Sequence, residues 1–439
     1  MIKKDIFKLD QLIKMKFNQS NLLFNDVKNI IPLGSQTFSK SYRFLPKKNS
    51  PLFVKKGNGC YFWDIDNNKF IDMVSGLLSV TVGYNVKEIN SAIKKQLNNG
   101  VSFSLATKLE YQLAKKIIKH VPCAEMVRYA KNGSDVTTAA IRLARSITKQ
   151  NNIMFSGYHG WHDWYIGSTS MNNGVPNEIS KQSFNFEFNN FNSFLEQYQK
   201  AGKKVAAVII EPMNTVEPKK NFLKQIRTFC TKNKIILIFD EICTGFRFSL
   251  GGAQKIFNVT PDLTTLGKGI ANGFPLSVLV GKKKYMKKCE DIFFSSTFGG
   301  EALSLSAAIS VINFFEKKNV INHLYKMGIY LKTEITEFLK DEEVMFINLV
   351  GNPTWTFFIF KDFKNYKKEE IKTLFLQEVI KRGVFTFGTN NINFSHKKKH
   401  INDTIKVYKD VIIQINKKVN NKKKLLKYKP IKNLFTVRK

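Results

Sequence analysis

Cysteine is scarce in this 439-residue sequence, and no two cysteines form a C-x-x-C pair. Zinc sites and disulfide frameworks usually show closely spaced or evenly numbered cysteines. The five cysteines here are odd in number and widely separated: Cys60, Cys123, Cys230, Cys243 and Cys289. We therefore expect reduced thiols, no disulfide framework and no metal site.

Long hydrophobic runs are also missing. No apolar stretch approaches the roughly 20 residues that a helix needs to cross a bilayer. The first residues, MIKKDIFKLDQLIKMKF, are amphipathic and charged, without the continuous apolar centre of a signal peptide. We expect a cytoplasmic protein that has no membrane partner, with an amphipathic helix within residues 1 to about 30.

Acidic residues are few: 34 Asp and Glu stand against 70 Lys and Arg, a formal net charge of +36. Such an excess of positive charge ordinarily suggests nucleic acid or an anionic membrane as partner. The lysines, however, are spread through the chain among many Asn, Ile and Phe, as in a proteome biased towards A·T-rich codons. We therefore interpret the charge as a solvated basic surface and expect no nucleic-acid partner; a basic protein that binds polyanions is the alternative.

Strand and helix signals alternate through the middle of the chain. Apolar runs at 126–130, 153–155, 205–211 and 235–239 read as buried strands, and the pattern at 134–149 predicts a helix between two of them. Such alternation predicts an α/β protein with a large, doubly wound, mostly parallel sheet. We assign residues 74–330 to this domain, and residues 1–73 and 331–439 to a small α+β domain built from both termini.

One stretch, Ile235–Ile270, suggests the chemistry. Its apolar run ends on the adjacent carboxylates Asp240 and Glu241, and it closes on Lys268 between two glycines. A lysine can form a Schiff base with an aldehyde cofactor, and an acid can keep that cofactor's ring nitrogen protonated. The cofactor with these needs is pyridoxal 5′-phosphate (PLP). Alternation along the strand turns Glu241 away from Asp240, so we expect a structural role for Glu241.

Two further segments suit the same cofactor. Gly133 and Ser134 stand where a short strand gives way to a helix, and free N–H groups at a helix start can hold a phosphate. Most such turns are simple helix caps. Glu211 ends another buried strand, and ligands of open α/β sheets bind beyond the carboxyl ends of strands. A carboxylate that merely caps a neighbouring helix is the alternative for Glu211.

The segment SGYHGWHDW follows a strand and contains two histidines three residues apart. His159 and His162 resemble a metal-ligand pair, but no third ligand stands nearby, and the glycines disfavour a rigid helix. We therefore expect no metal here. Tyr158 is suited to lie flat on a cofactor ring, since Gly157 and Gly160 allow the backbone to approach closely.

Together these residues carry a resemblance. The stretches at 57–76, 124–145, 157–164, 237–247, 251–281 and 296–300 stand in an order and spacing similar to those of the class III (ω-) aminotransferases of PLP fold type I. Within that family the sequence resembles the glutamate-1-semialdehyde 2,1-aminomutase group. The likeness covers nearly the whole chain, from about Ile31 to about Ile413.

The resemblance implies roles for single residues. Lys268 matches the Schiff-base lysine, and Asp240 the partner of the pyridine nitrogen. Ile242 and Tyr158 match residues that pack on the two faces of the ring, whereas Gly133 and Ser134 match phosphate contacts. The resemblance places Glu211 near the ring hydroxyl and Thr297 at the phosphate of a neighbouring subunit. It thus implies a homodimer with its sites at the interface.

Two departures from the aminomutases bear on the reaction. Their SPVRAF-like segment, whose arginine holds the substrate carboxylate, reads TFSKSYRF here, so Lys40 or Arg43 are the candidates for that task. Trp161 lies in another loop in which we expect substrate specificity. The gating segment after the YHG motif is short in this chain, from Gly167 to Ile179. A mutase must retain its intermediate, whereas a transaminase must release a product between two half-reactions.

The short gate favours a transaminase. We predict a PLP enzyme that moves an amino group by a ping-pong mechanism from an amino-acid donor, glutamate, to a carbonyl acceptor such as a keto-sugar or a specialised metabolite. Glutamate-1-semialdehyde 2,1-aminomutase itself is the alternative. A non-catalytic basic binding protein on this fold is a remote one, because a binding module has no reason to keep Lys268, Asp240 and the phosphate turn together.

Overall fold

The computed structural model describes residues 15–421 and 424–432 and divides the chain into two compact units. The large unit comprises Gly76–Thr81 and Lys87–Asn322; the small unit comprises, of the described residues, 15–75, Val82–Val86, 323–421 and 424–432. The expected N-terminal helix is observed as α2 (Asn18–Ile30), and its first part, residues 1–14, lies outside the described residues. Within the described residues no helix combines the length and the apolar character needed to span a bilayer.

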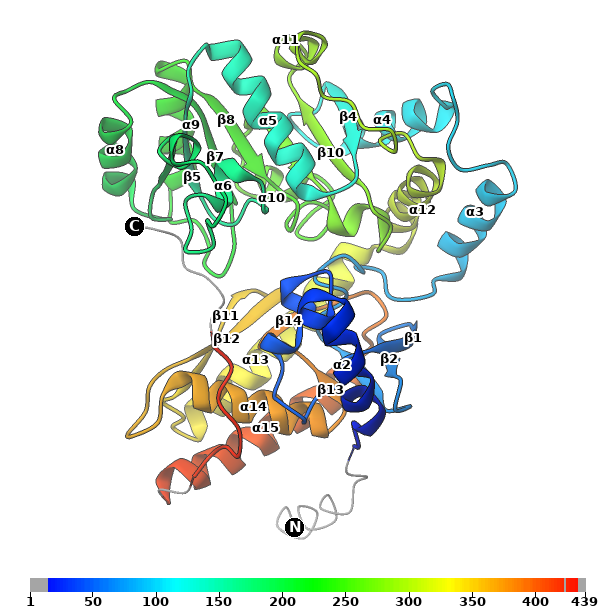
Figure 1. The fold of residues 1–439 in the computed structure, drawn as a ribbon, viewed down its shortest axis with the longest axis vertical. Coiled ribbons are helices and arrows are strands. Elements are labelled where there is room, and N and C mark those ends of the chain that lie inside the picture. The colour runs from blue at the N-terminus through cyan, green and yellow to red at the C-terminus, as the bar shows by residue number, and fades with distance from the viewer. Residues whose placement is uncertain (1–14, 422–423, 433–439) are drawn as a thin grey trace. The chain divides into compact units, whose positions relative to one another are not determined.

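The large unit is built on a seven-stranded sheet (Figure 1). Its strands, in spatial order, are β4 (Met126–Ala130), β10 (Ser277–Gly281), β9 (Leu263–Leu266), β8 (Ile236–Asp240), β7 (Val205–Ile210), β5 (Asn152–Ser156) and β6 (Ser183–Asn185). Only β10 runs antiparallel to its two neighbours; the pairs from β9 to β6 are all parallel. The prediction of a large, mostly parallel sheet is confirmed.

Helices cover both faces of this sheet, as expected for strands that are buried on each side. On one face α5 (Gly133–Thr148) packs its buried side chains against Phe155 and Ile238, among others. On the other face α8 (Phe191–Lys200) and α9 (Phe222–Lys232) pack against Leu237 and Phe239 (Figure 1). Successive side chains of a strand alternate between faces, so the strand β8 delivers Asp240 on the α5 side and Glu241 on the opposite side.

The other helices of the large unit connect or flank these strands. They are α3 (Lys87–Leu97), α4 (Lys108–His120), α6 (Asp163–Ile166), α7 (Asn177–Ser180), α10 (Gly252–Ile256), α11 (Lys283–Met286) and α12 (Ala302–Lys318), with 3-10 turns η5 (Lys268–Ala271) and η6 (Lys287–Asp291). The helix α13 (Val320–Asp341) then leads into the small unit.

The small unit joins the two ends of the chain in one sheet. Strands β1 (Val54–Asn58), β2 (Tyr61–Asp64) and β3 (Lys69–Asp72) form a meander, and β13 (Val384–Phe385) adds in parallel to β3. A second sheet contains β11 (Ile347–Asn352), β12 (Trp355–Phe360) and β14 (Thr389–Asn391). The small α+β part built from both termini is therefore present as predicted.

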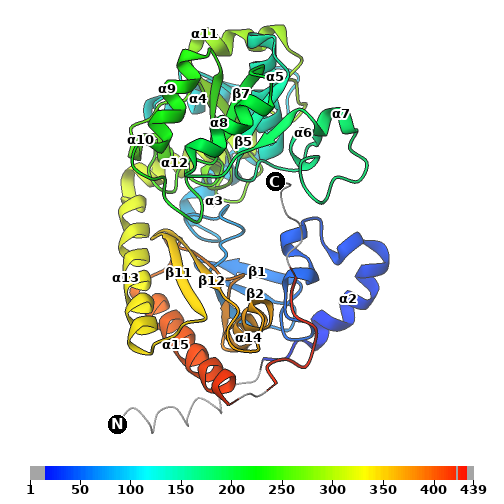
Figure 2. The same ribbon diagram turned by 90° about the vertical axis from the view of Figure 1, so that its left-hand side faces the viewer.

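Two helices cover the second sheet of the small unit, α14 (Lys368–Lys381) and α15 (Lys398–Asn420), beside β12 in Figure 2. Phe358 of β12 places its ring 4.9 Å from that of Phe375 and 5.1 Å from that of Tyr408, centroid to centroid. Aromatic pairs at such distances bury large areas and stabilise the contact between sheet and helices.

Candidate functional site

The carboxyl ends of β7 and β8 bring two acidic residues to one edge of the large sheet. The strands are parallel neighbours with Ile210 paired to Phe239, so Glu211 and Asp240 follow side by side. Glu211 accepts hydrogen bonds at Oε2 from the backbone N–H of Tyr158 (2.9 Å) and from Nδ2 of Asn214 (2.7 Å). Burial and the nearby charge of Asp240 raise the pKa of Glu211. The loop after β5 is thereby fastened to this edge.

Asp240 is 3% exposed and accepts three hydrogen bonds. Its Oδ2 lies 2.8 Å from Nδ1 of His159, and its Oδ1 accepts from Oγ1 of Thr265 (3.1 Å) and from the N–H of Ile242 (3.2 Å). Because a carboxylate oxygen only accepts, Nδ1 of His159 carries the proton of that bond. A buried carboxyl group without such partners would be costly, so these three contacts satisfy the polar atoms of Asp240 in its buried setting.

The contact of His159 with Asp240 is a feature of the candidate site that does not follow from the sequence. His162, three residues further on, places Nδ1 2.8 Å from Oγ1 of Thr138. The side chain of His159 is fully buried, and its Nε2 has no hydrogen-bond partner among the described residues. Among all the residues that the structure describes, no group of three His, Cys, Asp or Glu side chains is arranged to hold a metal. The sequence contains one signal for this contact: His159 lies in the loop after one strand, and Asp240 ends another strand.

Lys268 opens the turn η5, directly after β9 and Gly267, with a left-handed φ of 42°. This conformation is uncommon for a residue with a side chain and is found preferentially at functional sites. Nζ of Lys268 donates a hydrogen bond to Sγ of Cys243 at 2.7 Å. Burial lowers the pKa of Lys268, but the Cys243 sulfur and the carboxylates of Glu211 and Asp240 raise it by more, so the net shift is upward. Lys268 thus lies near enough to Glu211 and Asp240 for the charges of both to act on it.

Ile242 joins the start of α5 to the lysine turn. A Cβ atom on Gly133 would lie 2.7 Å from Cδ1 of Ile242, and one on Gly267 would lie 3.4 Å from its Cγ2. A larger residue at position 133 would therefore require the end of the Ile242 side chain to move. The isoleucine therefore lies between the α5 start and the residue that precedes Lys268.

The loop after β5 packs against the same helix start. Oγ of Ser134 accepts a hydrogen bond from the N–H of Trp161 (3.2 Å), and Oγ1 of Thr137 donates to the carbonyl of His159 (3.0 Å). Gly160 has φ 103°, and a Cβ there would come within 2.2 Å of Oγ of Ser134. Gly160 is thus required for two reasons: its positive φ and its close contact with Ser134 of α5.

The other predicted residues lie nearer the surface or in the small unit. Tyr158 and Trp161 are 50% and 67% exposed, so both side chains are accessible in this chain. Thr297 is also exposed and lies in the turn before α12. Lys40 and Arg43 belong to the small unit, on the 3-10 turns η3 (Phe38–Lys40) and η4 (Tyr42–Phe44), and their role stays a prediction.

Glu241 has the structural role expected from strand alternation. Its carboxylate is fully buried and accepts hydrogen bonds from the N–H groups of Ala253 (2.5 Å) and Gln254 (2.9 Å) at the start of α10, and from Oγ1 of Thr244 (2.7 Å). It therefore holds α10 against the end of β8 and takes no part in the group around Asp240.

We expect Glu241→Ala to lower the free energy of unfolding by about 3 kcal/mol or more, because it leaves buried donors unsatisfied. Urea unfolding followed by circular dichroism measures this loss. Glu241→Gln, which keeps the size and one acceptor oxygen, is the matched control and should lose less. A loss below about 1 kcal/mol for the alanine variant would contradict the structural role.

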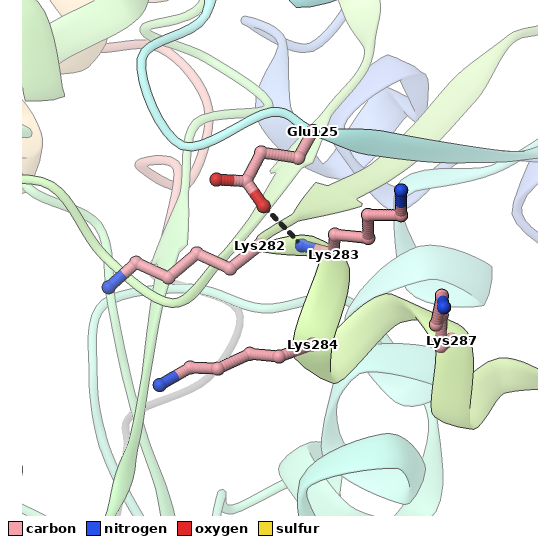
Figure 3. A pocket seen from close by; sticks show the side chains of 5 residues that line it. All are labelled: Glu125, Lys282, Lys283, Lys284 and Lys287. Carbon is pink, nitrogen blue, oxygen red and sulfur yellow. Dashed lines mark hydrogen bonds between the residues drawn. The ribbon is translucent and has the colours of Figure 1, made fainter.

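A separate pocket of about 520 Å³ is lined by Glu125, Lys282, Lys283, Lys284 and Lys287 (Figure 3). Oε2 of Glu125 accepts a hydrogen bond from the N–H of Lys283 at 2.6 Å. Because β10 runs antiparallel to its neighbours, Lys282 at its end lies at the edge of the sheet opposite to Asp240. None of the predicted site residues lines this pocket, so the chemistry belongs elsewhere.

The comparisons with known proteins agree with this geometry. The family model "Aminotransferase class-III" matches residues 44–411. The 3-aminobutyryl-CoA aminotransferase of Cloacimonas acidaminovorans (strain Evry) is 33% identical over 414 residues, covering 92% of this chain and 99% of that protein. The glutamate-1-semialdehyde 2,1-aminomutase of Wigglesworthia glossinidia brevipalpis is 34% identical over 425 residues, covering 89% and 97%.

Solved structures share the fold. The PLP internal aldimine form of the FumI protein of Sphingopyxis sp. MTA144 superposes with a TM-score of 0.85, at 22% identity, over 92% of this chain and 98% of that one. At such identity the likeness concerns the fold, including the large mostly parallel sheet and the second, smaller part of the chain.

Proposed function

Because this chain belongs to the class III aminotransferase family, enzymes with pyridoxal 5′-phosphate as cofactor, we propose that it is a transaminase whose site is the group around Asp240 and Lys268. The observation that carries the proposal is the buried contact of Asp240 with His159. Glu211 follows its strand at the same edge of the sheet. The charges of both acids act on Lys268. A basic binding protein fits this observation less well, because it has no use for a buried carboxylate supported by three donors. The argument against an aminomutase is a separate one, the short gating segment from Gly167 to Ile179.

The residues present fit the cofactor. Gly160 leaves no space for a Cβ atom beside Ser134, which keeps the backbone of the 157–161 loop close to the start of α5. The N–H groups of Gly133 and Ser134 at this helix start would hold the phosphate. Asp240 would pair with the ring nitrogen, Ile242 and Tyr158 would pack on the two ring faces, and Glu211 would lie near the ring hydroxyl.

The chemistry follows from what these side chains can do. When bound, the cofactor withdraws the electron pair that is left as a substrate C–H bond breaks. Nζ of Lys268 must lose a proton before it can attack a carbonyl carbon. After the substrate amine has displaced the lysine, Nζ would take the proton from the substrate carbon as a general base and later donate it as a general acid. Asp240 would face the ring nitrogen, and the hydrogen bonds from His159, Thr265 and the Ile242 N–H fix the position of its carboxyl group.

We further propose that the active enzyme is a homodimer. Thr297 lies in an exposed turn between two exposed aromatic side chains, Phe293 at 83% and Phe298 at 56%. Leu105 and Tyr111 of the same unit are 85% and 62% exposed. Large apolar side chains left open to water favour burial against another protein surface, which supports the delivery of Thr297 to the cofactor phosphate of a neighbouring subunit.

For the reaction we propose glutamate as amino donor and a keto-sugar or another carbonyl metabolite as acceptor. Lys40, Arg43 and Trp161 remain the candidates for substrate contacts. The residues after the loop at 157–161 support transamination: α6 spans only Asp163–Ile166, and the chain returns to α7 by Asn177. The aminomutase stays the second candidate because relatives with that name are 31–35% identical to this chain.

Two measurements test the proposal. Purified protein supplied with PLP should turn yellow, and borohydride should fix the cofactor on the peptide that contains Lys268; a protein that stays colourless contradicts the enzyme. L-Glutamate alone should then convert the cofactor to its amine form and release one equivalent of 2-oxoglutarate per site. If glutamate has no effect while glutamate-1-semialdehyde yields 5-aminolevulinate, the enzyme is the aminomutase.

A further inference from the structure

A mostly buried ion pair stands just outside the site described above. Nζ of Lys131, which stands two residues before Gly133, lies 2.9 Å from Oε2 of Glu301 and 3.1 Å from Oγ of Ser304. The side chains of Lys131 and Glu301 are only 15% and 12% exposed. An ion pair so far removed from water is costly to break, because the remaining charge is left without a partner.

At one end of the pair, Lys131 belongs to the turn that starts α5. The N–H groups of Lys131 and Asn132 both point to Oδ2 of Asp135, at 3.3 and 2.7 Å. The carbonyl of Asn132 accepts a hydrogen bond from Oγ of Ser277 at 2.8 Å. The orientation of the next two N–H groups, those of Gly133 and Ser134, therefore depends on how this short turn is held.

At the other end, Glu301 caps α12. It accepts hydrogen bonds from the N–H groups of Leu303 (2.6 Å) and Ser304 (3.2 Å). The turn just before it contains Thr297 and closes with a bond from the N–H of Gly299 to the carbonyl of Ser296 at 3.0 Å. Burial raises the pKa of Glu301, but hydrogen bonds from the Ser304 hydroxyl, from Lys131 and from the N–H of Leu303 together lower it by more, so the net shift is downward.

The Thr297 turn also rests on the strand that leads to Lys131. A Cβ atom on Gly299 would lie 3.0 Å from the carbonyl oxygen of Tyr129, in β4. The contact of Gly299 with Tyr129 and the ion pair of Lys131 with Glu301 thus connect the same two segments. They hold together two segments that are far apart in sequence, the turn before α5 and the turn before α12.

We propose that Lys131 and Glu301 are a positioning pair that fixes the phosphate turn of α5 relative to the Thr297 turn. The inference rests on the proposed function and deepens it. In a dimer each subunit presents the first turn to its own cofactor phosphate and the second to that of its neighbour, and the pair sets the distance between the two. Neither Lys131 nor Glu301 touches the reacting atoms. Loss of the pair should therefore weaken the binding of the cofactor through its phosphate group.

The test compares PLP with pyridoxal, the same aldehyde without its phosphate. The holoenzyme is stripped of cofactor with hydroxylamine, and each compound is titrated into the protein while the absorbance is followed. In Lys131→Met we expect the affinity for PLP to fall by about 10- to 100-fold, as when a supporting partner of a binding group is lost. The affinity for pyridoxal should change less than about twofold.

Lys131→Arg, which keeps the charge and can still reach Glu301, should restore most of the PLP affinity. Lys409→Met is the control, because it breaks a pair of similar length with Glu334 (3.0 Å) in the small unit. If Lys131→Met does not fold, Lys131→Met/Glu301→Gln replaces it, since that variant leaves no unpaired charge. Equal losses for PLP and pyridoxal, or no loss of PLP affinity, overturn the inference. Wild-type protein that binds no PLP contradicts the proposed function instead.

Discussion

Lys268→Ala is expected to slow the amino-group transfer from L-glutamate by at least about 10³-fold, since one side chain supplies both the attachment of the cofactor and the proton transfer. The variant should still bind PLP through its phosphate and ring contacts, because Gly133, Ser134 and Asp240 are unchanged. Borohydride should no longer attach the cofactor covalently, and dialysis should remove it. Stopped-flow absorbance with glutamate, together with mass spectrometry of the reduced protein, measures both effects.

Lys255→Ala is the matched control for Lys268. Lys255 lies in the same unit, is exposed on α10, and removing its side chain breaks no ion pair described in the structure. It should leave the rate and the covalent attachment as in the wild type. Should Lys268→Ala keep a rate within tenfold of the wild type, or should borohydride still trap the cofactor on it, another lysine performs the reaction.

The sequence predicted those features of the site that depend on local pattern. Runs of apolar residues identified β7 and β8, and the alternation of side chains along a strand separated Asp240 from Glu241. Likewise, the glycine at position 160 indicated a close backbone approach, and the structure shows that it lies against Ser134 at the start of α5. These inferences held because each rests on the chain within a few residues of the feature.

The contacts that were missed join residues distant in the sequence. His159 lies 81 positions from Asp240, and Lys131 lies 170 positions from Glu301. Neither pairing follows from periodicity or from turn chemistry, because it depends on which strands become neighbours and where their loops end. Cys243 is a further case: its spacing from the other cysteines indicated an ordinary thiol, whereas its position places it 2.7 Å from Nζ of Lys268.

Asp240→Asn is the second large-effect prediction. The substitution removes the negative charge beside the proposed ring nitrogen, which would then lose the proton that makes the ring a good electron acceptor. We expect the rate of the glutamate half-reaction to fall by about 10²- to 10⁴-fold. The affinity for PLP should fall much less, because the phosphate contacts and the attachment to Lys268 remain. The same stopped-flow measurement gives the rate, and titration of stripped protein gives the affinity.

The local hydrogen bonds make Asp240→Asn a test of charge more than of folding. An asparagine keeps the shape, and its carbonyl oxygen can still accept from Thr265 and the Ile242 N–H. Its amide nitrogen would then face Nδ1 of His159, which can accept if the imidazole moves its proton to Nε2, the atom without a partner among the described residues. Thermal unfolding should therefore shift little. Asp291→Asn, at an exposed pair with Lys288, is the control. A fully active Asp240→Asn enzyme would show that the negative charge on this buried acid is not needed.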